Sequence, residues 1–337
     1  MTSSLVDWAG AVRTGGRWAP LGPRITAAEA TQVVQELRTL SARAESVVRE
    51  VTGLGSGLPM ADAEGVDRPG WIAATAQGMA LLAAPLEARI VERTSGSAKT
   101  SGVGGAQVGA ILGFLSGKVL GQFDPVVGEG RLLLVAPNIV KVERALHADP
   151  TDFRMWVCLH ESTHRLQFTA VPWLREHFGA LTRRFGETAD LDSGELVRRL
   201  RAALGKGAGG GESWIERIQT PQQRVVFDEL MALMSLLEGH ADHVMDAVGP
   251  QVIPTVAAIR RSFGERRRKG SGPLDRVLRS LLGMDVKMAQ YVRGEKFVSA
   301  VVDAHGMGAF NTVWTSPETL PTRAEIGDPQ RWAARVL

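Results

Sequence analysis

Two histidines stand four residues apart in a largely apolar stretch of this chain, His160 and His164, with Glu161 directly after the first. On a helix, residues four apart lie one turn above each other, so both imidazoles project from one face. Imidazoles placed in this way can share one zinc ion, and the glutamate beside them can take a proton from a metal-bound water. The motif therefore predicts a metal-binding helix that supports metal-assisted hydrolysis.

The residues around the motif predict that this helix is buried. Asp149 offers an N-cap oxygen and Pro150 suits the first helical position, so the helix is expected to begin there. Burying polar groups without a partner costs on the order of a few kcal/mol, and a metal would be one such partner. A hydrogen-bonded histidine pair without metal is the alternative interpretation. Apolar residues and the histidines recur at helical steps of three and four: Phe153, Trp156, Val157, His160, His164 and Phe168.

A catalytic zinc takes three protein ligands and leaves one position for water, so the chain must supply another ligand. Residues 220–248 are expected to form a long helix, with Thr220 as N-cap and Gly249 as the stop. Glu238 interrupts the apolar stripe of this helix, where a carboxylate needs a nearby cation to stay charged. Competing ligands lie within the same two turns: His240, Asp242 and His243.

Glu238 is followed one turn later by Asp242, which resembles the ExxxD arrangement of thermolysin-like zincins. That resemblance implies that Glu238 binds zinc and that Asp242 accepts a hydrogen bond from the outer nitrogen of His160. The metzincin arrangement instead needs a histidine six residues after His164, preceded by a glycine three residues earlier. Residue 170 is Ala where the histidine is needed, and residue 167 is Gln where the glycine is needed. The metzincin arrangement is therefore excluded.

Longer stretches of the chain resemble a largely uncharacterised family of bacterial zincin-like metallopeptidases, typical of actinobacteria. They are Leu132–Leu146, Trp156–Trp173, Glu238–Asp246, Gln290–Trp314 and Pro317–Pro321. The resemblance extends from about Gly105 onward. It implies that His160, His164 and Glu238 are the zinc ligands and that Glu161 is the general base. One subgroup of this family, of similar length, is associated with biosynthesis of a deazaflavin coenzyme.

The expected fold class is mainly α (α+β), a zincin-like metallopeptidase fold with a small β element before the metal helix. Residues 26–53 and 71–95 are predicted to be helices of an N-terminal helical layer. Residues 131–137, a short apolar run ended by proline, are the clearest strand. By resemblance to zincins this strand is a peptide-binding edge, and the alternative is an ordinary core strand.

The domain organisation expected from the sequence has two parts. An N-terminal helical region, residues 1–125, packs on a zincin-like metal-binding region, residues 126–337. The second region contains a flexible loop at 205–213, because a glycine-rich tract packs poorly.

A peptidase also needs a group that stabilises the oxyanion formed at the attacked carbonyl. Tyr291 is the single tyrosine of the chain and lies in a segment, residues 287–298, that is expected to be helical. Tyr291 is the first candidate for this role, and His243 and His305 are the others.

Residues 106–120 are apolar, but they are too short for a membrane span, which needs about 20 residues. We predict a buried helix in which Gly109, Gly113 and Gly117 admit the backbone of a neighbouring helix, with the metal helix as one candidate neighbour. No membrane partner is therefore expected.

Composition narrows the other partners and the compartment. The chain has 39 basic and 36 acidic residues, a net charge of only +3, so no nucleic-acid surface is expected. The single cysteine, Cys158, excludes an internal disulfide and is interpreted as a packing residue. The N-terminus lacks the basic and apolar pattern of a secretory signal, so a cytoplasmic location is expected. The sequence favours no particular oligomeric state.

Two functional classes follow from the motifs. The first is a zinc-dependent metallohydrolase of the HExxH plus glutamate (gluzincin) type, acting on a peptide or amide substrate through a zinc-activated water. The second is a catalytically silent, zinc-stabilised binding or assembly protein on a zincin scaffold. Glu161 favours the first class, because a structural site needs no base and commonly fills all four positions with protein ligands.

Overall fold

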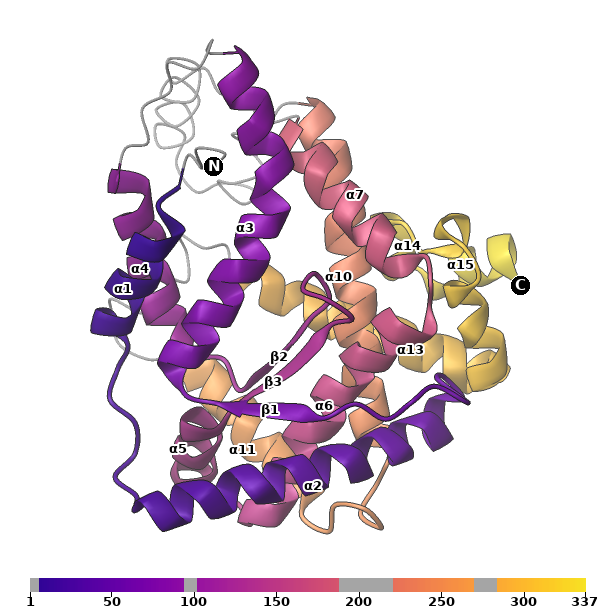
Figure 1. Ribbon diagram of the computed structural model, residues 1–337. Helices are drawn as coiled ribbons and strands as arrows, with labels where there is room; N and C mark the ends of the chain where they lie inside the picture. The colour runs from indigo at the N-terminus through magenta and orange to yellow at the C-terminus, as the bar shows by residue number, and fades with distance from the viewer. Residues whose placement is uncertain (1–5, 94–101, 188–220, 270–283) are drawn as a thin grey trace. The chain divides into compact units, whose positions relative to one another are not determined.

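The computed structural model describes residues 6–93, 102–187, 221–269 and 284–337 (Figure 1). The chain divides into two compact units, the first comprising Met1–Arg175 and Ala241–Glu265 and the second Glu176–His240 and Arg266–Leu337. Helices dominate the described ranges, and three strands form one small sheet, so the predicted mainly α fold class is confirmed. No helix within these ranges combines the length and apolar character needed to cross a membrane.

Two predicted features fall outside the described residues, the loop at 205–213 and the N-cap at Thr220. The domain division near residue 125 stays a prediction.

The sheet lies in the first unit and consists of β1 (Ala63–Val66), β2 (Gly121–Asp124) and β3 (Arg131–Val135). The strand order is β1-β3-β2, with β1 parallel and β2 antiparallel to β3. The strand predicted at 131–137 is therefore the central strand of the sheet, and its interpretation as a peptide-binding edge is wrong. Both of its sides are already occupied by neighbouring strands, and among the described strands β2 is an edge.

The two faces of β3 pack against different helices. Successive side chains of a strand point to opposite faces, and directly paired residues share a face. Leu133 and Val135 belong to a buried cluster with Trp71 and Ile72 of α3 (Arg68–Arg93). On the other face, Phe123 of β2 stacks on Phe168 at 5.9 Å between ring centroids. Phe168 lies on α6 (Pro150–Ala170), so the sheet is held between α3 and α6.

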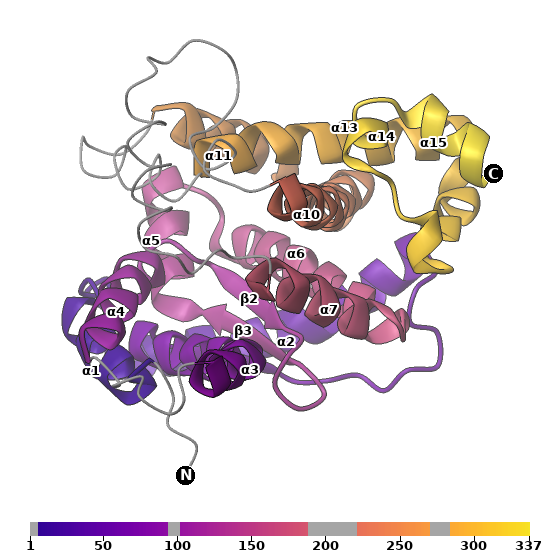
Figure 2. The same cartoon turned by 90° about the horizontal axis from the view of Figure 1, so that it is seen from above.

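The glycine-rich helix predicted at 106–120 is α4 (Gly102–Ser116), and it packs against α1 (Trp8–Trp18). Figure 2 shows the two helices side by side. A Cβ atom added to Gly109 would lie 2.5 Å from the carbonyl oxygen of Ala11, and one added to Gly113 would lie 2.9 Å from that of Gly15. The predicted close approach of another helix backbone to these glycines is confirmed. The expectation that this helix is the metal helix is wrong, because the neighbour is α1. Small residues permit a close helix contact without indicating which helix makes it.

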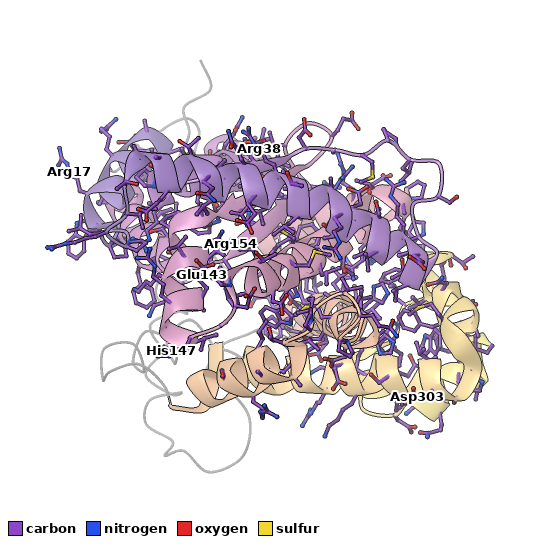
Figure 3. All side chains as sticks on the ribbon, turned by 90° about the horizontal axis from the view of Figure 1, so that it is seen from below. Arg17, Arg38, Glu143, His147, Arg154 and Asp303 are labelled. Atoms are coloured by element: carbon purple, nitrogen blue, oxygen red, sulfur yellow. The ribbon has the colours of Figure 1, made fainter. Side chains whose placement is uncertain are left out.

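The helix predicted at 26–53 is α2 (Ala27–Thr52), which packs on α6. It begins with a capping box between Thr26 and Glu29. A buried guanidinium, that of Arg154 on α6, joins three helices. Its Nη2 atom lies 2.7 Å from Glu143 of α5 (Ala136–Leu146), and its Nη1 atom lies 2.6 Å from Glu36 of α2. Arg154 and Glu143 are labelled in Figure 3.

The metal helix α6 begins where the sequence predicts, because Asp149 accepts a hydrogen bond from the main-chain N–H of Asp152 at 3.0 Å. The carboxylate of Asp152 in turn accepts from the main-chain N–H and the hydroxyl of Thr255, at 2.8 and 2.6 Å. Thr255 directly precedes α11 (Val256–Lys269), so the starts of α6 and α11 are fastened to each other.

The second unit contains α13 (Met284–Phe310) and most of α7 (Leu174–Glu187) and α10 (Pro221–Ala247). The residues of α10 from Ala241 onward belong to the first unit. Helices α10 and α13 touch through their backbones, because a Cβ atom added to Gly294 would lie 2.0 Å from the carbonyl oxygen of Ser235. The chain then forms η1, η2, α14 and α15, and Figure 2 shows α14 and α15 beside the end of α13. Their bounds are Asn311–Trp314, Pro317–Thr319, Arg323–Ile326 and Pro329–Val336.

Candidate metal centre

The two histidines of the motif lie on α6 and point their inner nitrogens at each other. The Nε2 atoms of His160 and His164 are 3.1 Å apart, and the rings stand almost perpendicular, at 87°. Two nitrogens bound to one tetrahedral zinc at 2.0–2.1 Å would be roughly 3.3 Å apart. The imidazoles therefore already have the spacing that one shared ion requires.

The outer nitrogens of both rings contact protein groups. Nδ1 of His164 lies 2.9 Å from the amide oxygen of Gln167, one turn further along α6. Nδ1 of His160 lies 3.3 Å from the sulfur of Met245 on α10. A proton on each Nδ1 leaves each Nε2 with the lone pair that a metal needs.

Glu238 supplies the carboxylate of the site. It lies on α10, two turns before Met245. One ligand atom each of His160, His164 and Glu238 lies within 4.8 Å of the other two. In the part of the chain that the structure describes, this is the group of histidine, cysteine and acidic residues whose geometry can hold a metal ion.

The donor set fits zinc. Two imidazoles and one carboxylate are the ligands of a common class of catalytic zinc site, in which the fourth position takes water. All three residues are half-buried.

Glu161 lies against the edge strand of the sheet. Its side chain is buried, and a Cβ atom added to Gly121 of β2 would lie 2.8 Å from its Oε1 atom. Any residue other than glycine at position 121 would collide with the Glu161 carboxylate where it now lies. Neither Gly121 nor Gln167 was singled out as functional from the sequence. Gly121 meets Glu161 only in the folded chain, whereas Gln167 follows His164 by one turn, a spacing that could have indicated it.

The competing ligands predicted near Glu238 are not part of the three-residue group. The buried ring of His240 stacks on Phe310, with centroids 5.3 Å apart, and lies 5.4 Å from the ring of Trp314. His243 is half-buried on α10.

Asp242, expected to orient His160, lies with its Oδ1 atom 3.5 Å from the Nη1 atom of Arg260. Arg260 also donates to the main-chain carbonyl of Asp242 at 2.6 Å. The orienting role of Asp242 stays a prediction.

The oxyanion-stabilising role expected of Tyr291, His243 or His305 stays a prediction. Tyr291 belongs to α13, which confirms that its segment is helical, but its side chain lies outside the described residues. His305 is exposed on α13.

Cys158 is a packing residue. It is fully buried, and its Sγ atom lies 3.7 Å from the carbonyl oxygen of Leu37 on α2. Burial raises the pKa of the Cys158 thiol above its ordinary value, and the negative charges of Glu161 and Glu36 act in the same direction. The thiol therefore stays protonated and is a poor metal ligand.

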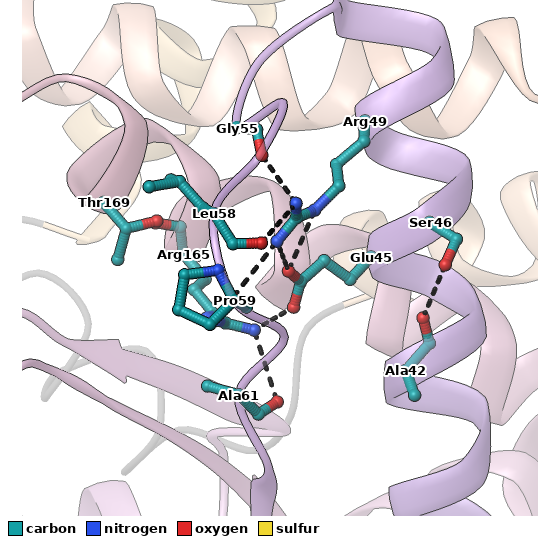
Figure 4. Close-up of polar contacts among 10 residues, drawn as sticks. All are labelled: Ala42, Glu45, Ser46, Arg49, Gly55, Leu58, Pro59, Ala61, Arg165 and Thr169. Carbon is teal, nitrogen blue, oxygen red and sulfur yellow. Dashed lines mark hydrogen bonds and ion pairs between the residues drawn. The ribbon is translucent and has the colours of Figure 1, made fainter.

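Directly behind the metal helix, Arg165 and Arg49 share the carboxylate of Glu45 (Figure 4). The side chains of Arg165 and Glu45 are only 6% and 2% exposed. The two guanidinium groups also donate to main-chain carbonyl oxygens of the segment between α2 and β1, those of Gly55, Leu58, Pro59 and Ala61. We call this group the Glu45 cluster.

A helical chain with a small sheet and two imidazoles converging with a carboxylate defines the zincin-like class of metal-dependent hydrolases. Comparison with known families places the chain more closely: it belongs to the zincin-like metallopeptidase family, whose sequence pattern it matches over residues 6–333. The resemblance to zincin-like metallopeptidases inferred from the motifs is thus confirmed, while the bacterial origin and the association with deazaflavin coenzyme biosynthesis stay predictions.

A solved structure is similar along almost the whole length. It is a crystal structure described as a "putative hydrolase with a novel fold" from Chloroflexus aurantiacus. The two chains are 32% identical, the similarity covers 98% of each, and the TM-score is 0.69. No curated protein matches the chain.

Proposed function

We propose that this protein is a zinc-dependent peptidase of the gluzincin type, with His160, His164 and Glu238 as the metal ligands. The observation that carries the proposal is the convergence of one ligand atom from each residue within 4.8 Å. When bound, zinc lowers the pKa of a coordinated water toward neutrality and polarises the carbonyl to be attacked. The substrate is a peptide or another amide.

Glu161 is the proton carrier in this proposal. It directly follows the proposed ligand His160 in sequence, and the residue as a whole is only 5% exposed, so bulk water has little access to it. It accepts the proton of the attacking water and returns it to the leaving amine. Because the same carboxylate acts first as the base and then as the acid, the proton transfer needs no other titratable group.

The edge strand β2 is the proposed binding surface for the substrate backbone. An extended peptide can add to an open sheet edge through main-chain hydrogen bonds. A peptide paired with β2 at Gly121 would run past the carboxylate of Glu161, which lies against that residue. The proposed peptide-binding edge is therefore β2, and not the strand at 131–137.

Substitution of Gly121 by alanine tests the role of β2. The new methyl group would come within 2.6 Å of the Glu161 Cγ atom, so the carboxylate must shift. We expect kcat/KM for peptide hydrolysis to fall by about tenfold or more, since misplacing a catalytic group by about 1 Å can cost roughly 100-fold. Bound zinc should stay at the level of the original protein.

The matched control is Gly16→Ala on α1, where an added Cβ atom has no neighbour within 4 Å. It should leave kcat/KM unchanged. Full activity of the Gly121→Ala variant would remove β2 from the proposed mechanism.

Metal analysis paired with a cleavage assay tests the proposed function itself. We expect purified protein to carry about one zinc per chain and to cleave members of a peptide library, since three protein ligands plus water make a catalytic site. A chelator should abolish cleavage, and added zinc should restore it. Protein that takes up no divalent metal would contradict the proposal, while bound zinc without cleavage would favour the zinc-stabilised assembly protein.

A further inference from the structure

Gln167 is a buried polar side chain next to the metal centre. It lies on α6 one turn after His164, and none of its surface is exposed to solvent. Its amide oxygen lies 2.9 Å from Nδ1 of His164. A buried amide is costly unless it is hydrogen-bonded, so packing alone would favour an apolar residue of similar size at this position.

The contact determines which nitrogen of His164 carries the proton. An amide oxygen can only accept a hydrogen bond, so the donor must be an N–H at Nδ1. A neutral imidazole with its proton on Nδ1 has the lone pair on Nε2. Nε2 is the atom that lies 3.1 Å from its counterpart in His160, where the ligand atoms converge.

The other histidine has a weaker partner. Nδ1 of His160 faces the thioether of Met245, and a thioether sulfur is a weak acceptor. Met245 belongs to another helix, whereas Gln167 and His164 share one turn of α6. The contact at His164 therefore depends only on α6 being helical.

We propose that Gln167 is a positioning residue, which extends the metal-binding motif by three residues and holds His164 in the tautomer and orientation for binding zinc. This inference rests on the proposed function. A neutral amide performs the task without the added negative charge of a carboxylate, which would make the imidazole a more basic ligand. Gln167 stands where the metzincin arrangement has glycine, and in this proposal it orients a metal ligand.

Zinc affinity of the Gln167→Met variant tests the inference. Methionine preserves the size of the side chain and removes the strong acceptor. We expect zinc to bind about 10- to 100-fold more weakly in competition with a chromophoric chelator, as is typical for loss of a group that orients a metal ligand. The visible absorption bands of the cobalt(II)-substituted protein should also shift, because they report ligand geometry. Gln167→Glu keeps an acceptor at the same distance and should restore zinc affinity.

Thr163→Val is the matched control. Thr163 is equally buried and adjacent to the motif histidine, but its hydroxyl donates to the main-chain carbonyl of Leu159 at 2.8 Å. Its zinc affinity and cobalt spectrum should equal those of the original protein. If Gln167→Met does not fold, Gln167→Asn, which withdraws the amide by one methylene, takes its place in both measurements.

The outcomes separate the two proposals. Unchanged zinc affinity and an unchanged cobalt spectrum in the variant would overturn the role of Gln167 and leave the proposed peptidase intact. An original protein that binds no zinc would overturn both. If Thr163→Val weakens zinc binding as much as Gln167→Met does, the specific role of Gln167 is also overturned. Loss of any buried polar group near the site would then be enough to weaken zinc binding.

Discussion

Replacing Glu161 with glutamine is expected to lower peptide turnover by about 10²- to 10⁴-fold, the range typical of removing a general acid–base group. Glutamine has nearly the same shape, so it should fit the space beside Gly121 where the carboxylate lies. It cannot accept the proton of the attacking water. Because Glu161 is not among the three converging ligands, bound zinc should stay at the original level. Turnover and zinc content are measured on the same preparation.

Glu64→Gln is the control for this substitution, since Glu64 is an exposed acid on β1 in the same unit. It should leave turnover unchanged. Turnover that survives in Glu161→Gln would refute the proposed proton carrier, and loss of zinc in that variant would show that Glu161 supports the metal site and has no separable chemical role.

Replacing Glu45 with glutamine is expected to lower the free energy of unfolding by about 3–5 kcal/mol, the cost of leaving a buried charge without its partner. Glu45 is the shared acid of the Glu45 cluster, and its loss leaves the guanidinium groups of Arg165 and Arg49 without a carboxylate among the contacts of the cluster. Urea denaturation followed by helical circular dichroism measures the effect.

The contrast is an exposed ion pair of the same unit. Arg13 and Asp7 lie 3.5 Å apart with side chains 65% and 43% exposed. Arg13→Met should cost less than about 1 kcal/mol, because solvent screens exposed pairs. Equal losses in Glu45→Gln and Arg13→Met would show that burial of the cluster contributes nothing to its strength.

Local features of the fold could be predicted, while non-local ones could not. The starts of α2 and α6 and the end of α10 depend on residues within one turn, such as the cap at Asp149 and the glycine after the helix, Gly249, with φ 65°. The strand order depends on pairing of segments more than fifty residues apart, as between β1 and β3. A run of apolar residues does not indicate which strands it pairs with. The sequence therefore left residues 131–137 as either an edge strand or a core strand.

The same distinction holds in the candidate site. Spacing along one helix indicates His160 and His164, and a charged residue in an apolar stripe indicates Glu238. The contacts of Met245 and Gly121 come from elements that meet only in the folded chain. Gln167 is the exception, because its contact with His164 is local, and the spacing of the two residues on one helix was a usable signal.

The Glu45 cluster holds residues 55–61 by their main-chain carbonyl oxygens, and this makes the segment suited to site-specific labelling (Figure 4). Met60 is 47% exposed, so a cysteine there would react with a fluorophore while the buried Cys158 would not. Gly55 has to be kept, because its φ of +73° is strained for other residues and a Cβ atom would lie 2.6 Å from Leu166. A dye at position 60 would thus be anchored, through Arg165, to the helix that carries the histidines.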